Sequence, residues 1–147
     1  MSASQLQLLS VHMQEEGSAA YNIPMPFWLR GRLDPAALRL ALEAMARRHD
    51  ALRTTFAVDA AGEFRQEVRS EVGDIWREAT AEDEDGALRV VAEDAAMGFD
   101  LWAGPVLRCT LVRVRADLHL LSITVHHVAF DGASRGPFFS ASWRTST

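Results

Sequence analysis

Two adjacent histidines close an apolar run near the end of the chain. His126 and His127 follow this run directly, and Asp131 and Gly132 come a few residues later. An imidazole can exchange a proton near neutral pH, so either histidine is a candidate general base. Because side chains alternate across a strand, the two rings are expected on opposite faces, and at most one of them faces a reaction site. The alternative is that both rings are structural, as hydrogen-bonded polar groups in the packing.

Two other chemical patterns lie in the same region. A metal site would need His119 beside the histidine pair and Asp131, but side chains on opposite faces of a strand chelate one ion poorly, so no bound metal is expected. Residues 132–136 match the G-x-S-x-G nucleophile elbow, in which the acid and the histidine come later in the chain. The eleven residues that follow contain no Asp, Glu or His, so the triad cannot be completed. Ser134 is therefore interpreted as a helix-start residue.

Composition limits the function classes. The chain has 147 residues, 48% of them hydrophobic and 24% charged, which suits one folded core. Its fifteen basic residues, all arginine, against twenty acidic ones give a net charge of −5, which argues against a nucleic-acid binder. One cysteine, Cys109, cannot form an internal disulfide, and we expect a reducing compartment. The sequence has neither an apolar run of about 18 residues nor a secretory signal, so a cytoplasmic protein away from membranes is expected.

Hydrophobic spacing and turn residues predict the elements that position the histidines. Asp34 followed by Pro35 predicts a capped helix start, and two apolar runs joined by a tight turn predict a hairpin at the centre of a sheet. A segment with two prolines, 21–26, is interpreted as an extended connection. The order of elements favours an α/β (α+β) fold, a mixed sheet with flanking helices. The predicted helices are 2–16, 34–49 and 82–96, and the predicted strands are 27–33, 52–58, 63–68, 75–79, 106–114 and 118–128.

Several of these residues together resemble one family. Residues 126–132 read His-His-Val-Ala-Phe-Asp-Gly and are similar to the HHxxxDG signature of condensation domains in nonribosomal peptide synthetases, which chloramphenicol-acetyltransferase-like acyltransferases share. Residues 47–56 resemble the second condensation-domain motif, RHExLRTxF, with Asp50 in place of Glu. Phe99-Asp100-Leu101, with the Gly-Pro-Val-Leu-Arg of 104–108, resembles the segment before the central strands.

The start of the chain resembles a weakened form of another family motif. Residues 2–9 are similar to the amino-terminal SxAQxRLWxL, but Gln7 and Leu9 stand where the family has Arg and Trp. The motifs follow one another in the family's order. The resemblance implies that 1–139 form one chloramphenicol-acetyltransferase-like lobe, the N-terminal lobe of the domain, and that 140–147 are an atypical tail, left by a truncation or a frameshift.

The resemblance also implies a mechanism and roles for residues. An acyl or peptidyl thioester on one carrier domain meets the amine of an aminoacyl thioester on another, both on phosphopantetheine arms, and a peptide bond forms with no other cofactor bound. His127 would be the catalytic residue, as general base or as a positioner of the amine. His126 would pack, Asp131 would hold its loop through an arginine, and Gly132 would leave space for substrate. Arg53 would support the active-site region.

Alternatives stay open within and beyond this family. An epimerisation domain or a coenzyme A-dependent acyltransferase of the same superfamily would share the signature. A non-catalytic fragment that docks carrier domains is a third possibility. The expected partners are peptidyl carrier domains and the C-terminal lobe of the domain, without which the isolated chain is expected to be inactive.

Overall fold

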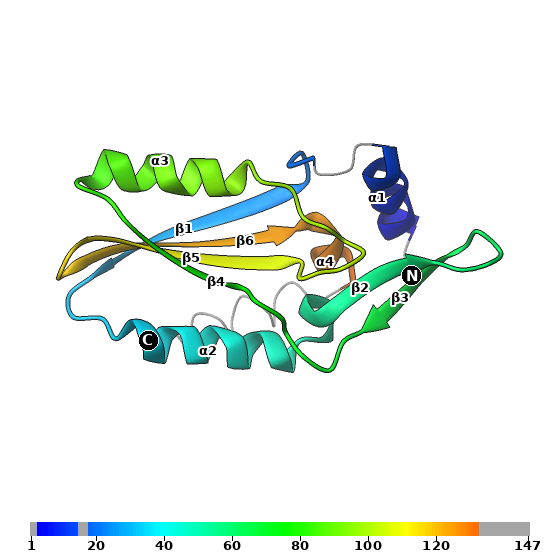
Figure 1. Ribbon diagram of the computed structural model, residues 1–147, viewed down its shortest axis with the longest axis horizontal. Helices are drawn as coiled ribbons and strands as arrows, with labels where there is room; N and C mark the ends of the chain where they lie inside the picture. Colours follow the sequence, from blue (N-terminus) through cyan, green and yellow to red (C-terminus); the bar gives the residue numbers. More distant parts are fainter. Residues whose placement is uncertain (1–2, 15–17, 133–147) are drawn as a thin grey trace.

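The computed structural model describes residues 3–14 and 18–132, with the side chains of Gln14, Phe130 and Asp131 left out. It contains a four-stranded sheet in the order β1-β6-β5-β4 and a separate two-stranded sheet, β2-β3 (Figure 1). The strands are β1 (Asn22–Arg30), β2 (Thr54–Val58), β3 (Phe64–Val68), β4 (Trp76–Thr80), β5 (Leu107–Arg115) and β6 (Leu118–His126). The helices are α1 (Ala3–Gln14), α2 (Pro35–Arg48), the 3-10 turn η1 (Asp50–Arg53), α3 (Glu84–Ala95) and α4 (His127–Gly132).

The four-stranded sheet is mixed, as the sequence predicts. Its three neighbouring strands β1, β6 and β5 pair antiparallel, and β4 joins β5 in parallel. The predicted hairpin forms the centre of the sheet, with Leu107 opposite Val125 and Leu111 opposite Leu121. Every residue of β6 is buried. The strand that leads to the histidine pair is therefore the most enclosed element of the fold.

Helices α2 and α3 cover opposite faces of this sheet (Figure 1). On one face, alternate residues of β6 such as Leu121 and Val125 share a large apolar cluster with Leu42 and Met45 of α2. On the other face, Leu120 packs in a small cluster with residues of α3. The period of two along a strand separates these sets, and both faces of β6 lie inside the molecule.

The first strand is longer than its sequence indicates. Residues 27–33 are predicted as a strand and 21–26 as a connection, but β1 runs from Asn22 to Arg30 and includes Pro24 and Pro26. The prolines fit because β1 is an edge strand, paired only with β6. Alternate residues of an antiparallel strand bond to the neighbour, so the two missing N–H groups fall on the free side, where no partner is needed.

The start of α2 is capped as the sequence predicts, whereas the buried face of α3 is not the one that hydrophobic spacing indicates. The Asp34 carboxylate accepts hydrogen bonds from the N–H groups of Ala36 and Ala37, with Pro35 in the first turn as predicted. In α3, Leu88 stands at helical spacing from the buried Val91, but its own side chain is 46% exposed. The buried face of α3 is instead Ala87, Val91 and Asp94. A charged residue takes the place of an apolar one there because it has a buried partner in the sheet, described below.

Part of the predicted organisation falls outside the described residues. The tail at 140–147 and the serine of the G-x-S-x-G match belong to 133–147, of which the structure gives no description. Within the residues that are described, no helix is long and apolar enough to cross a membrane.

Candidate active site

The strand β6 ends at the first of the two histidines. Its predicted continuation to residue 128 is wrong, because His127 is already the first residue of α4. The backbone turns here because the Nδ1 atom of His126 accepts a hydrogen bond of 3.0 Å from the Val128 N–H. That bond occupies an N–H at the start of α4 that the helix leaves unpaired. The alternation of a strand therefore does not decide where the His127 ring points.

His126 lies in the protein interior, as its predicted packing role requires. It is 3% exposed, with the Phe99 ring set edge-on to it and the Tyr21 ring tilted against it at centroid distances of 6.2 and 6.4 Å. Burial, and then the charges of nearby His12 and His127, lowers the pKa of His126 from 6.5 to about 4. The ring is thus neutral at pH 7, and because Nδ1 accepts a hydrogen bond, its proton sits on Nε2.

His127 is more accessible than its neighbour. Its side chain is half-buried, and its backbone N–H donates a 2.9 Å hydrogen bond to the carbonyl of Tyr21 just before β1. The main chain of the residue is thereby anchored at the junction of β6 and α4. The pair thus consists of a buried, neutral His126 and a partly buried His127, and the division of roles between them stays a prediction.

Helix α1, far away in the sequence, supports α4. Helix α1 contacts it, and the Gln5 Nε2 donates a 3.3 Å hydrogen bond to the carbonyl of Val128. His12 of the same helix is buried and meets the Trp102 ring at a centroid distance of 5.4 Å. Sequence reasoning does not single out His12 or Tyr21, because neither belongs to a motif and both lie far from the histidine pair along the chain.

Arg53 binds two separate pieces of backbone and one carboxylate side chain. Its guanidinium donates to the carbonyl of Arg47 at the end of α2, to the carbonyl of Arg69 after β3, and to the Asp50 carboxylate. Asp50 is the residue that departs from the family motif, and it serves as a partner for Arg53. Since η1 contacts α4, Arg53 fixes a segment next to the candidate site, and its supporting role in activity stays a prediction.

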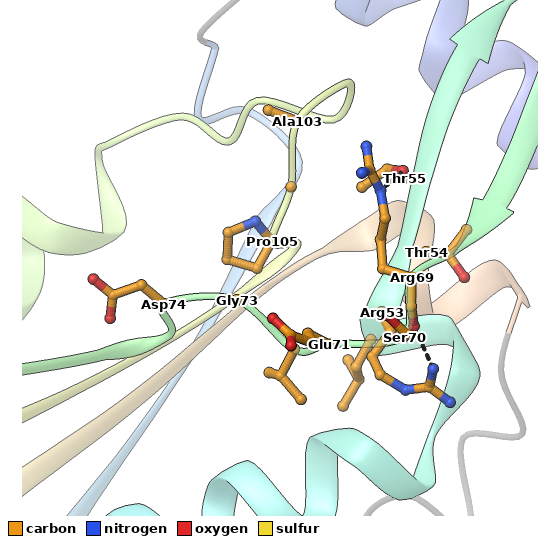
Figure 2. Close-up of a pocket in the computed structure, with 13 residues that line it drawn as sticks. Arg53, Thr54, Thr55, Arg69, Ser70, Glu71, Gly73, Asp74, Ala103 and Pro105 are labelled. Atoms are coloured by element: carbon orange, nitrogen blue, oxygen red, sulfur yellow. Dashed lines mark hydrogen bonds between the residues drawn. The ribbon is translucent and has the colours of Figure 1, made fainter.

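Arg53 also lines part of a pocket of about 470 Å³ (Figure 2). Arg69 lies in its wall and donates a 2.9 Å hydrogen bond to the Thr55 hydroxyl. Gly104 has a positive φ of 71°, and an added Cβ would lie 2.8 Å from Thr55, so only glycine lets this loop approach β2. None of the histidines lines the pocket, and it is separate from the candidate active site.

The remaining predicted site residues are placed only by their backbone. Asp131 and Gly132 belong to α4, and the arginine salt bridge expected of Asp131 falls outside the description because the Asp131 side chain is left out. A group of three or more His, Cys, Asp or Glu side chains suited to a metal ion does not occur among the described residues.

The buried neutral His126 predicts a pH-dependent stability. Between about pH 6.5 and 4 the unfolded chain binds a proton at this ring and the native chain does not, so the free energy of unfolding falls as the pH falls. The full effect is about 3 kcal/mol. His119 adds to it in the same direction, since burial and the nearby Arg113 also lower its pKa. Urea unfolding between pH 4 and 7.5 measures the slope, and the His126→Gln variant should have a flatter one. An equal slope in both proteins would contradict the burial of a neutral ring.

Comparisons with known proteins agree with the motifs. The family model for the condensation domain matches residues 1–141. The chain is 37% identical over 142 residues to phosphinothricin tripeptide synthetase PhsC of Streptomyces viridochromogenes, covering 92% of this chain and 13% of that protein. It is also 34% identical over 139 residues to tyrocidine synthase 3 of Brevibacillus parabrevis, covering 92% of this chain and 2% of that protein.

Solved structures show the same fold. The starter condensation domain of the rhizomide synthetase RzmA matches with a TM-score of 0.76 at 22% identity, over 87% of this chain and 32% of that one. The X-domain from teicoplanin biosynthesis, solved in complex with OxyB, matches with a TM-score of 0.75 at 35% identity, over 86% of this chain and 27% of that one. The chain thus spans less than a third of the length of each of these relatives. From its matched residues and its fold, it belongs to the condensation-domain family.

Proposed function

We propose that the chain is the N-terminal lobe of a condensation domain that forms an amide bond between two carrier-bound substrates. The observation that carries this proposal is the partly buried His127 at the junction of β6 and α4, beside a buried and neutral His126. Partner domains that carry phosphopantetheine arms would deliver the donor thioester and the acceptor amine. A second lobe would supply the opposite wall of the site.

The chemical step needs one group that moves or holds a proton. The acceptor nitrogen attacks the carbonyl carbon of the donor thioester, a C–N bond forms, and the C–S bond breaks. The amine proton leaves through His127 and reaches the departing thiolate, so that the ring returns to its starting state after the reaction. His126 cannot take this role, because it is buried and its Nδ1 already accepts the Val128 N–H. General-base help of this kind contributes about 10²–10⁴-fold to a rate.

A second candidate is a docking module without chemistry. The likeness to the X-domain, solved in complex with OxyB, favours it, because identity to that domain is higher than to the starter condensation domain. The histidine pair and the neutral His126 favour the enzyme, since a docking surface has no need of an accessible imidazole at a strand end.

A chimera tests the two candidates against each other. Residues 1–141 replace the matching segment of the condensation domain of phosphinothricin tripeptide synthetase PhsC, whose carrier domains are then loaded with donor and acceptor. Mass spectrometry of the acceptor carrier is expected to show the condensed product. A folded chimera that binds both carriers and forms no product would support the docking module and overturn the enzyme.

A further inference from the structure

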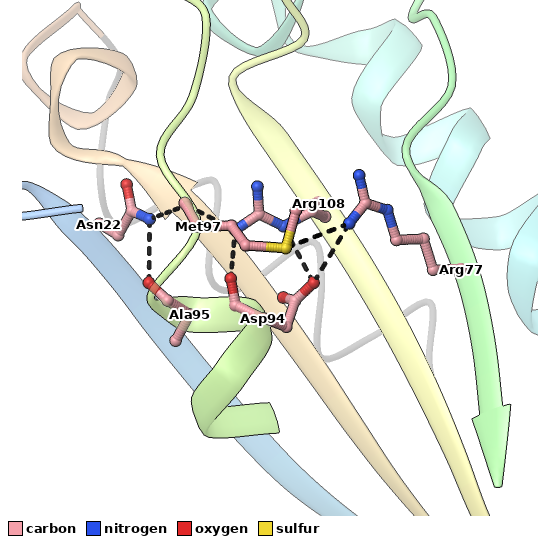
Figure 3. A network of polar contacts seen from close by, with 6 residues as sticks. All are labelled: Asn22, Arg77, Asp94, Ala95, Met97 and Arg108. Carbon is pink, nitrogen blue, oxygen red and sulfur yellow. Dashed lines mark hydrogen bonds and ion pairs between the residues drawn. The ribbon is translucent and has the colours of Figure 1, made fainter. Parts of the chain in front are cut away.

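A buried ion pair lies under the carboxyl end of α3 (Figure 3). Arg108 of β5 and Asp94 of α3 each have side chains that are 7% exposed, and the Arg108 Nε lies 3.1 Å from an Asp94 carboxylate oxygen. The Arg108 Nη2 also donates to the carbonyls of Asp94 and Met97, and the Asn22 amide donates to the carbonyls of Ala95 and Met97. These bonds satisfy carbonyl groups that the end of a helix leaves free.

Stability alone does not explain why this pair is charged. Taking two charges out of water costs several kcal/mol per ion, and well-packed apolar residues of similar size often serve a fold equally well. Further along α3 the contact with the sheet is apolar, with Ala87 and Val91 packed on Val112 and Leu120. A guanidinium is therefore present here for what it contacts besides Asp94.

Besides the carbonyl groups of Asp94 and Met97, the guanidinium also contacts the ring of Phe99. The Arg108 Cζ lies 4.5 Å from the centroid of the Phe99 ring, over its face. A cation over a ring face attracts the ring and restricts its tilt. Phe99 also makes an edge contact with His126, with the ring centroids 6.2 Å apart and an interplanar angle of 82°. Phe99 thus lies between the guanidinium and the buried histidine.

The register of the sheet brings these groups together. Asn22 is opposite His126, and Arg108 is opposite Thr124, two residues before His126 on the same face of β6. His126 in turn accepts the N–H of Val128 at the start of α4. A continuous set of contacts therefore runs from the ion pair through Phe99 and His126 to the helix that begins with His127.

We propose that Arg108 is a positioning residue for the histidine pair, holding the Phe99 ring against His126 and so fixing the start of α4 and the direction of His127. This inference rests on the proposed function in one respect, since the direction of His127 matters only if His127 faces substrates. Arg108 itself acts through Phe99 and does not touch the reacting groups.

The test uses hydrogen exchange at one amide of the isotope-labelled 147-residue chain. Arg108→Lys keeps a charge for Asp94 but loses the flat guanidinium over the ring, and Phe99→Leu removes the ring. In both variants we expect the Val128 amide to exchange at least tenfold faster and the His126 ring resonances to shift, while the Leu121 amide in the core of β6 keeps its rate. Faster exchange confined to Val128 separates positioning from a general loss of stability.

Arg77→Met is the matched control. Arg77 also pairs with Asp94, at 3.7 Å, but it is half exposed, and the cation over the Phe99 ring is Arg108. We expect this variant to leave the Val128 amide and the His126 ring unchanged. An unchanged Val128 amide in Arg108→Lys would overturn the proposal, and so would an equal effect in Arg77→Met. If Arg108→Lys does not fold, Phe99→Leu decides, and an unchanged Val128 amide in that variant overturns the proposal.

The same substitution in the chimera links the position of the ring to the reaction. There Arg108→Lys should lower kcat about tenfold with little change in KM, and a wild-type kcat would contradict the role. The exchange measurement needs no substrate. A chimera without any condensation activity would therefore count against the proposed function and leave the exchange result standing, whereas an active chimera with an unchanged Val128 amide would count against Arg108 alone.

Discussion

His127→Ala in the chimera should lower the rate of amide bond formation by at least 100-fold while the protein stays folded. A positioned general base contributes about 10²–10⁴-fold, and among the described residues the other imidazoles at the site, His12 and His126, are buried. The fold should survive because the His127 contact to Tyr21 is made by the backbone N–H, which alanine retains. The side chain is only half-buried, so its loss leaves no closed cavity, and alanine suits a helix start.

The measurement is the single-turnover rate with both carriers loaded, together with near-ultraviolet circular dichroism of the variant. His127→Gln, which can orient an amine but cannot take its proton, separates the two roles that the family motif allows. A rate near wild type for glutamine with a low rate for alanine would identify a positioner. A wild-type rate for alanine would show that His127 is not the catalytic residue.

His126→Ala is the contrasting control for this experiment. It removes a 3%-exposed ring and the acceptor of the Val128 N–H, so it should lower stability by about 1–3 kcal/mol for the unsatisfied N–H alone. Any fall in the rate of amide bond formation in His126→Ala should come from the displacement of α4. Equal stability of His126→Ala and wild type would contradict the packing role.

Asp94→Leu should destabilise the chain by about 3–5 kcal/mol, a large share of the stability of a domain of this size. The leucine leaves the Arg108 guanidinium 7% exposed beside an apolar side chain, and the nearby Arg77 is a second cation that cannot replace the lost carboxylate. Urea unfolding at pH 7 gives the free energy of unfolding. An unchanged m-value would show that the wild type and the variant expose the same amount of surface when they unfold.

The double variant Asp94→Leu with Arg108→Met tests the cause of this loss. With both charges gone, most of the stability should return, because no charge remains buried without a partner. About 1–2 kcal/mol should still be missing, since the hydrogen bonds from Arg108 to the carbonyls of Asp94 and Met97 are lost, although these carbonyls keep the Met97 N–H and the Asn22 amide as donors. Losses in the double variant that equal or exceed those of Asp94→Leu would contradict a buried charge as the cause.

Much of the fold was predictable because local spacing and caps decide it. Asp34 and Pro35 begin α2 where the sequence places it, and the hairpin of β5 and β6 forms the predicted centre of the sheet. The predictions that failed depend on neighbours far away in the chain. Pro24 and Pro26 are accepted in β1 because that strand is an edge, and the hydrogen bond from Val128 to His126 ends β6 before His127.

The family and the two histidines can be read from the sequence alone, because the signature is a local pattern of residue types and spacing. Which of the two rings is buried, by contrast, is set by the tertiary structure. His126 is buried and neutral through contacts with Tyr21, Phe99 and His12, while His127 opens a helix supported by α1 and η1. Burial and proximity come from residues as far as 123 positions apart, and no local pattern of the chain encodes how those residues meet.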